Sequence, residues 1–211
     1  MNEASKVPLA PVQSESSVQR SRFLALLFPC TGPTLARELL RNLKTTHKDA
    51  DHVVHAFICG TVESQTHGCS DDGEPSGTAG RPVLDVLKGF GATDTFLAVV
   101  RWFGGVKLGT GGLVRAYSQA ARQVLESAEW RIKVEQVALR LRVSYADQGA
   151  VRRLLEQAGA ELTYQCRSEA VELEFVIASA AEAELTRTLM DVTQGRVVWI
   201  KNPEVRADGL S

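Results

Sequence analysis

The order of apolar periodicities in the last 80 residues constrains the fold of this chain most. Six short segments there have a regular period, and they follow one another as strand, helix, strand, strand, helix and strand. They cover residues 133–143, 147–158, 160–166, 170–177, 181–192 and 196–200. The order β-α-β-β-α-β is that of the split βαβ, or ferredoxin-like, fold. We therefore predict a ferredoxin-like domain at residues 132–203 and a short tail at residues 204–211.

The first 131 residues have a different pattern, which predicts a separate β/α domain. Strand-like apolar runs alternate with helical periodicities, at residues 22–28, 34–48, 52–62, 81–88, 95–102 and 113–130. Residues 1–20 are polar and weakly patterned, and their prolines exclude a helix. Residues 63–80 hold few apolar side chains and are predicted to form a long loop. The chain as a whole is expected to be α+β, with two domains that meet near residue 131.

Composition narrows the class of protein further. The chain has 211 residues, of which 44% are hydrophobic and 23% charged, and its formal net charge is −1. This balance excludes a strongly basic nucleic-acid clamp but allows a local basic patch. The four cysteines form no C-x-x-C pair, so we expect neither a zinc finger nor a redox dithiol, and no metal or other cofactor. Without a signal-like or membrane-spanning stretch, we expect a cytoplasmic protein that does not bind membranes.

The segment RWFGGVKLGTGGLVRAY, residues 101–117, concentrates glycine and positive charge. No acidic residue occurs from Thr95 to Leu125. Glycine permits close backbone approach, and N–H groups at a helix start bind anions. We predict a site for nucleic-acid or other phosphate, formed by Arg101, Gly104, Gly105, Lys107, Gly109, Gly111, Gly112 and Arg115. The alternative is a tight strand-to-helix connection with incidental cations. The spacing matches neither a P-loop nor a dinucleotide-binding motif.

A second segment, SDDGEPSGTAGRP at residues 70–82, places three carboxylates within four residues. Asp71, Asp72 and Glu74 fit a Mg²⁺ site or a proton-sharing group. The same residues also fit a turn before a helix that starts near Thr78. Acidic side chains at that position stabilise the helix by interacting with its dipole. We favour the turn.

These two segments closely resemble the signature of the YigZ/IMPACT family, and residues 21–23 resemble its short Ser-Arg-Phe element. The resemblance covers roughly residues 6–201. It implies an N-terminal domain like the fourth domain of elongation factor G, and a ferredoxin-like second domain as in bacterial members. It also singles out Ser70, Asp71, Asp72, Glu74, Thr78 and Arg81, with Ser21, Arg22 and His52 upstream. Of the family's His-His-Cys-like cluster, only His52 has a counterpart here.

The resemblance also implies a general link to translation, because the family's eukaryotic member is a translation regulator. We expect a non-enzymatic regulator or accessory factor that binds the ribosome or RNA, or a protein partner in the translation machinery. One alternative is an enzyme that acts on a phosphorylated small molecule, or a hydrolase or peptidase, through Asp71, Asp72 and Glu74. Another is a protein-interaction module in which both segments only shape the fold, and which exposes an apolar patch.

Overall fold

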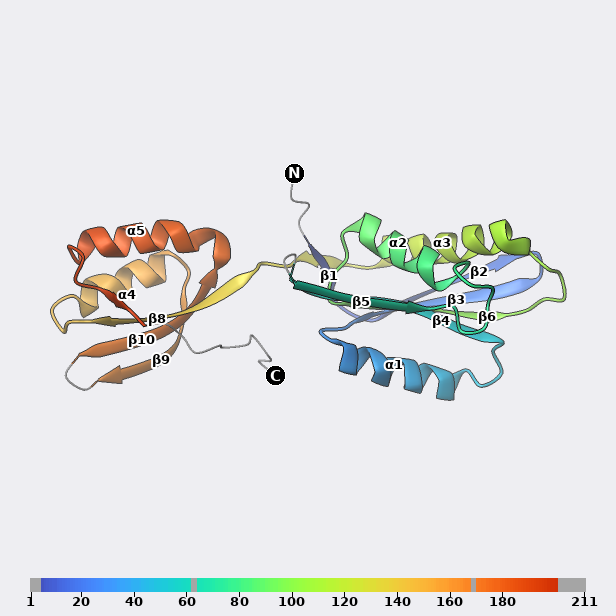
Figure 1. Cartoon of the computed structure of the whole chain (residues 1–211), viewed down its shortest axis with the longest axis horizontal. Coiled ribbons are helices and arrows are strands. Elements are labelled where there is room, and N and C mark those ends of the chain that lie inside the picture. The colour runs from blue at the N-terminus through green and yellow to red at the C-terminus, as the bar shows by residue number, and fades with distance from the viewer. Residues whose placement is uncertain (1–4, 62–63, 168–169, 201–211) are drawn as a thin grey trace. The chain divides into compact units, whose positions relative to one another are not determined.

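The computed structural model describes residues 5–61, 64–167 and 170–200 (Figure 1). Contacts group the chain into two units, residues 1–133 and 134–211, and each combines a sheet with helices. The predicted α+β class is therefore confirmed. The predicted tail at residues 204–211 lies outside the described residues. No helix in the described part of the chain is long and apolar enough to span a membrane.

The N-terminal unit is built on a five-stranded antiparallel sheet with the order β2-β3-β6-β4-β5. Its strands are β2 (Val12–Val18), β3 (Ser21–Pro29), β4 (His52–Thr61), β5 (Ser64–Ser70) and β6 (Thr95–Trp102). A second, two-stranded sheet pairs β1 (Lys6–Pro8) with β7 (Trp130–Ile132). Seven of the eight residues of β6 are buried, since this central strand is covered on both faces.

Helices cover both faces of this sheet (Figure 1). Helices α2 (Gly80–Phe90) and α3 (Gly109–Ser127) lie on one face, and α1 (Pro33–Thr46) lies on the other. Alternate residues of β3, β4 and β6 enter opposite cores: Phe23 packs with α2 and α3, whereas Leu24 packs with α1. The unit therefore has three layers, with the sheet in the middle.

The C-terminal unit has the strand order β11-β8-β10-β9, all antiparallel. This is the 4-1-3-2 order of a ferredoxin-like sheet. Its elements are β8 (Gln136–Val143), α4 (Gln148–Gln157), β9 (Glu161–Arg167), β10 (Val171–Ala178), a 3₁₀ turn at Ser179–Ala181, α5 (Glu182–Val192) and β11 (Val198–Trp199). Alternate residues of β10 are buried against the helices, as a strand with one covered face requires.

Several segments of the N-terminal unit differ from the sequence predictions. Strands β1 and β2 form within residues 1–20, for which no strand was predicted. Residues 64–70, predicted as part of a loop, form the edge strand β5, which pairs with β4 along its whole length. Its side chains are mostly exposed, so this strand carries no apolar alternation that could reveal it. Helix α3 begins at Gly109, four residues earlier than predicted. Gly109, Gly111 and Gly112 of the predicted phosphate site therefore lie in the first turn of this helix and not in a loop.

Candidate functional site

The three family-like segments meet at a buried polar group that we call the Glu74 cluster: Ser21, His52, Glu74, Arg101 and Tyr117. Oε1 of Glu74 accepts hydrogen bonds from Nη1 of Arg101 at 2.6 Å and from the Tyr117 hydroxyl at 2.7 Å. Nη2 of Arg101 donates to Oγ of Ser21 at 3.2 Å. The loop before α2, the end of β6, helix α3 and the start of β3 are thus joined through one carboxylate.

Because the charged side chains of the Glu74 cluster are buried, each depends on its partners in the cluster for stabilisation. Glu74 is 8% exposed and Arg101 is 4% exposed, so each charge has lost most of its hydration. The Arg101 guanidinium also lies 5.6 Å from the ring centre of Phe23 and 5.5 Å from that of Phe103. Burial and the adjacent Glu74 carboxylate raise the pKa of Tyr117, so its hydroxyl stays protonated and donates.

His52 lies at the partly exposed border of this cluster. Its Nδ1 is 2.9 Å from the carbonyl oxygen of Asp72, so Nδ1 carries the hydrogen of that bond. Its Nε2 faces Oε1 of Glu74 at 3.8 Å. His55 lies on the opposite face of β4 and stacks on Phe96. The two histidines therefore do not form a metal pair.

Two of the predicted site residues, Arg101 and Glu74, lie against each other in this cluster. Arg101 was predicted to bind phosphate and Glu74 was a candidate metal or acid–base group, but the structure pairs them with each other. They are 27 residues apart in sequence, and the absence of acids around Arg101 along the chain could not reveal this partner. Tyr117, which sequence analysis did not select, completes the pair. The signals for it were the buried period of α3 and its place at the end of the family-like segment 101–117.

Asp71 acts as the N-terminal cap of α2. Its carboxylate accepts backbone N–H groups from Gly77 at 2.8 Å, Ala79 at 3.0 Å and Gly80 at 2.8 Å. The residue at the N-cap position, Ala79, has no side-chain acceptor of its own. Partial burial acts to raise the pKa of Asp71, but the three N–H donors outweigh it and hold this pKa below its ordinary value.

Asp72 ties the same loop to the opposite layer of the domain. One carboxylate oxygen forms an ion pair with Lys44 of α1, and the other accepts the backbone N–H of Val53 at 2.7 Å. Burial opposes ionisation, yet these two partners lower the pKa of Asp72. The three acidic side chains thus point to three different sets of partners. Within the described residues, no group of three His, Cys, Asp or Glu side chains could hold a metal ion.

The remaining predicted residues of this loop have structural partners as well. Oγ of Ser70 accepts the N–H of Asp72 at 3.2 Å, and the Thr78 hydroxyl donates to the Pro75 carbonyl at 2.6 Å. Arg81 is exposed and pairs with Asp85 on α2 at 2.9 Å. The turn alternative for this segment therefore accounts for its hydrogen bonds.

Replacing Asp71 with alanine is expected to lower the free energy of unfolding by about 1–2 kcal/mol at pH 7, because α2 loses its cap. The charged Asp71 carboxylate contributes its full stabilisation above its ordinary pKa of 3.8, the value in the unfolded chain. This stabilisation disappears as pH falls through the lower pKa that Asp71 has in the folded protein. Urea unfolding at pH 7 and at pH 3 measures both effects. The exposed Asp191→Ala variant is the control, and an equal deficit for Asp71→Ala at both pH values would contradict this role.

The loop at residues 103–108 and the first turn of α3 are mostly exposed, in contrast to the buried Glu74 cluster. Lys107 and Arg115 are exposed in this segment. The first turn of α3 holds no acidic residue, and the helix N-terminus has no side-chain cap. Gly105 and Gly109 have φ values of +82° and +69°, a conformation that favours glycine. Gly111 is exposed, and Gly112 is half-buried.

Contacts with neighbouring turns hold this loop in place. A Cβ on Gly104 would lie 2.0 Å from the carbonyl oxygen of Arg20, so the loop packs directly on the β2–β3 turn. The N–H of Gly104 also donates to Oγ of Ser21 at 3.3 Å. Arg22 lies 3.7 Å above the centre of the Trp102 ring. Ser21 and Arg22 of the Ser-Arg-Phe element therefore contact the loop and the strand end that precedes it.

The site and the fold together define a two-domain α+β protein in which three signature segments support an exposed, glycine-rich helix start. A family model described as "Impact N-terminal domain" matches residues 19–125, and one described as "Domain of unknown function (DUF1949)" matches residues 141–196. The chain belongs to the IMPACT family.

Known proteins are similar to large parts of this chain. The IMPACT family member YigZ of Escherichia coli (strain K12) is 34% identical over 190 residues, covering 90% of this chain and 93% of YigZ. Protein IMPACT of Xenopus laevis is 32% identical over 143 residues, covering 64% of this chain and 45% of that protein. A crystal structure of a hypothetical protein is 32% identical, with a TM-score of 0.69, and covers 97% of this chain and 100% of that one.

Proposed function

We propose that this protein is a non-enzymatic accessory factor or regulator of translation that binds ribosomal RNA through residues 103–115. One observation carries the proposal: an exposed, uncapped helix start presents Lys107 and Arg115 with no acidic residue in its first turn. Free N–H groups at a helix start and its dipole attract phosphate. The translation link comes from the family resemblance, because its eukaryotic member regulates translation.

The proposed contact set divides into groups that touch phosphate and groups that position the loop. Gly105, Lys107, Gly109, Gly111 and Arg115 are exposed and form the contact surface. Arg101, Gly104 and Gly112 support it from inside. Phe103, the first residue of the loop, is 44% exposed and offers a ring face on which a base can stack.

The separate partners of the three acidic side chains disfavour the enzyme alternative. That alternative needs Asp71, Asp72 and Glu74 to act on one substrate or metal ion. Each carboxylate already accepts hydrogen bonds or an ion pair from a different part of the domain. Turning them toward a common ligand would remove the cap of α2 and leave Arg101 buried without a counter-ion. Binding therefore fits this site better than turnover.

Co-sedimentation with ribosomes over a salt series tests the proposal. Phosphate contacts release counterions, so affinity is expected to fall steeply with salt. The Lys107→Glu/Arg115→Glu variant is expected to bind about tenfold more weakly or worse at low salt, with a log–log slope reduced by about 2.

The matched control is Arg37→Glu/Arg41→Glu, which makes the same charge change on exposed residues of α1, on the other face of the sheet. The control is expected to bind like the wild type. Equal losses in both variants, or wild-type binding that does not respond to salt, would rule out this surface.

A further inference from the structure

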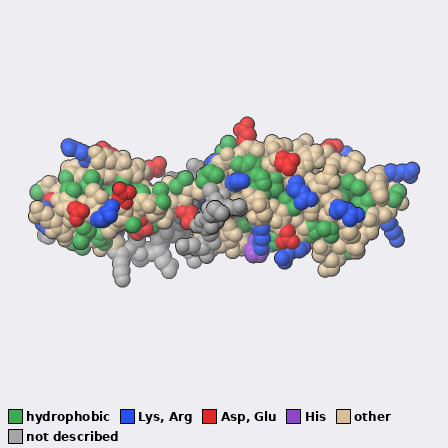
Figure 2. All heavy atoms as spheres, turned by 90° about the horizontal axis from the view of Figure 1, so that it is seen from above, with side chains coloured by type: hydrophobic (Ala, Val, Ile, Leu, Met, Phe, Trp, Pro, Cys, Tyr) green, Lys and Arg blue, Asp and Glu red, His purple; other side chains and the backbone are tan. Residues whose placement is uncertain are grey.

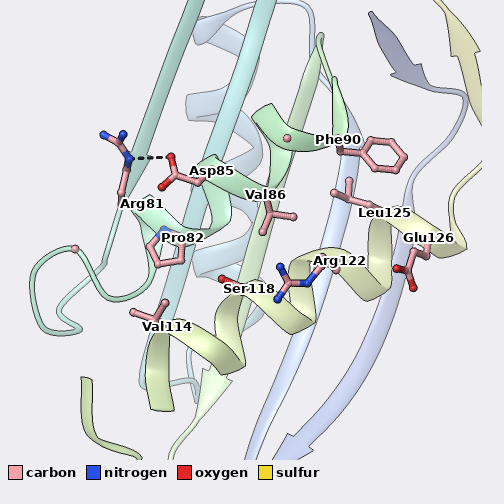
Figure 3. A pocket seen from close by; sticks show the side chains of 12 residues that line it. Arg81, Pro82, Asp85, Val86, Phe90, Val114, Ser118, Arg122, Leu125 and Glu126 are labelled. Carbon is pink, nitrogen blue, oxygen red and sulfur yellow. Dashed lines mark hydrogen bonds and ion pairs between the residues drawn. The ribbon is translucent and has the colours of Figure 1, made fainter. Parts of the chain in front are cut away.

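A groove of about 660 Å³ runs between α2 and α3, separate from the Glu74 cluster (Figure 3). Its apolar lining comes from both helices: Pro82, Val86 and Phe90 from α2, with Val114 and Leu125 from α3. Figure 2 looks onto the side of the N-terminal unit that carries these helices, where apolar side chains lie among scattered charges. Of the residues that line the groove, only Val114 lies within residues 103–115 of the proposed RNA contact.

Gly89 keeps the groove open. A Cβ at this position would have no heavy atom within 4 Å, and the residue has no positive φ. Neither close approach nor backbone conformation therefore requires glycine there. A glycine inside a helix costs about 0.5–1 kcal/mol relative to alanine. The space above Gly89 is therefore open to another molecule.

Not every charged side chain along the groove forms an ion pair within the described part of the chain. Arg81 pairs with Asp85, whereas no ion pair within the described residues involves Arg122 or Glu126. The Arg122 side chain reaches into the groove beside Ser118, and Glu126 lies one helical turn further along α3 (Figure 3). The α3 side of the groove thus offers one positive and one negative partner at helical spacing.

We propose that this groove binds an amphipathic helix of a partner protein, with an acidic residue facing Arg122 and a basic residue one turn away facing Glu126. The 11 residues of α2 extend over about 16 Å, which matches about three turns of a bound helix. Such a helix would place apolar side chains at positions i, i+3 or i+4, and i+7 onto Val86, Phe90 and Val114. An elongated groove lined from two helices fits this occupant better than a compact small molecule.

Selection from a phage-displayed library of random peptides of about 14 residues, with the full chain as target, tests the proposal. Enriched peptides are expected to have a helical apolar period with an acidic residue and a basic residue one turn apart. Fluorescence anisotropy with a labelled selected peptide then measures affinity. Gly89→Leu fills the groove and is expected to abolish binding, and Arg122→Glu to weaken it about tenfold, or about 1.4 kcal/mol.

Matched variants separate this effect from misfolding. Gly149→Leu makes the same change at another open, helical glycine, on α4, and is expected to leave peptide binding unchanged. A peptide whose acidic residue is replaced by arginine is expected to restore binding to Arg122→Glu. Ribosome binding by Gly89→Leu should equal that of the wild type, which keeps this surface distinct from the RNA contact. Failure to enrich helical peptides, or peptides that bind Gly89→Leu normally, would overturn the proposal.

Discussion

Replacing Glu74 with glutamine is expected to destabilise the N-terminal unit by about 3–5 kcal/mol, because it leaves the Arg101 charge buried without a counter-ion. The substitution conserves shape, so the loss reports on charge and not on packing. Arg101 is 4% exposed and cannot recover its hydration without moving the end of β6. The Tyr117 hydroxyl would also lose a charged acceptor.

Urea unfolding followed by tryptophan fluorescence measures this loss. A Trp199→Phe background restricts the signal to Trp102 and Trp130, which both belong to the N-terminal unit. The exposed Glu15→Gln on β2 is the control and is expected to change stability by less than about 0.5 kcal/mol.

A second substitution distinguishes the ion pair from simple damage to the fold. Adding Arg101→Met to Glu74→Gln removes the uncompensated cation, so the double variant is expected to be more stable than Glu74→Gln alone. Additive losses from the two substitutions would contradict a coupled pair.

Gly104→Ala is expected to destabilise the same unit by about 3 kcal/mol, through steric overlap. The added Cβ would lie 2.0 Å from the carbonyl oxygen and 2.1 Å from the carbonyl carbon of Arg20. Both atoms belong to backbone, which cannot rotate aside as a side chain can. The β2–β3 turn and the exposed loop must therefore separate, and ribosome binding is expected to weaken with them.

The same unfolding assay measures this effect. Gly89→Ala is the matched control, because a Cβ there meets nothing within 4 Å. That variant is expected to be as stable as the wild type or more stable by about 0.5–1 kcal/mol. A stability of Gly104→Ala within about 0.5 kcal/mol of the wild type would show that the loop does not depend on this close contact.

Local patterns predicted the central elements of the fold well. Strand β6 spans residues 95–102, the same residues as its apolar, β-branched run, because a strand covered on both faces needs such residues throughout. The order of elements at residues 133–200 likewise predicted the ferredoxin-like sheet. The edge strands of the N-terminal sheet were missed, since β2 and β5 have at least one exposed face and are held by main-chain pairing.

The sequence by itself determined the α+β class, the ferredoxin-like order and the signature segments that place the chain in its family. These features depend on local periodicity and spacing, which follow directly from the order of residues along the chain. Only the tertiary structure decided which charges remain available. It removes Arg101 from the surface by pairing it with Glu74, and it leaves Lys107, Arg115 and Arg122 exposed. The physical reason is that the energy of a charge depends on its burial and on partners brought close by folding, and neither can be read from neighbouring residues.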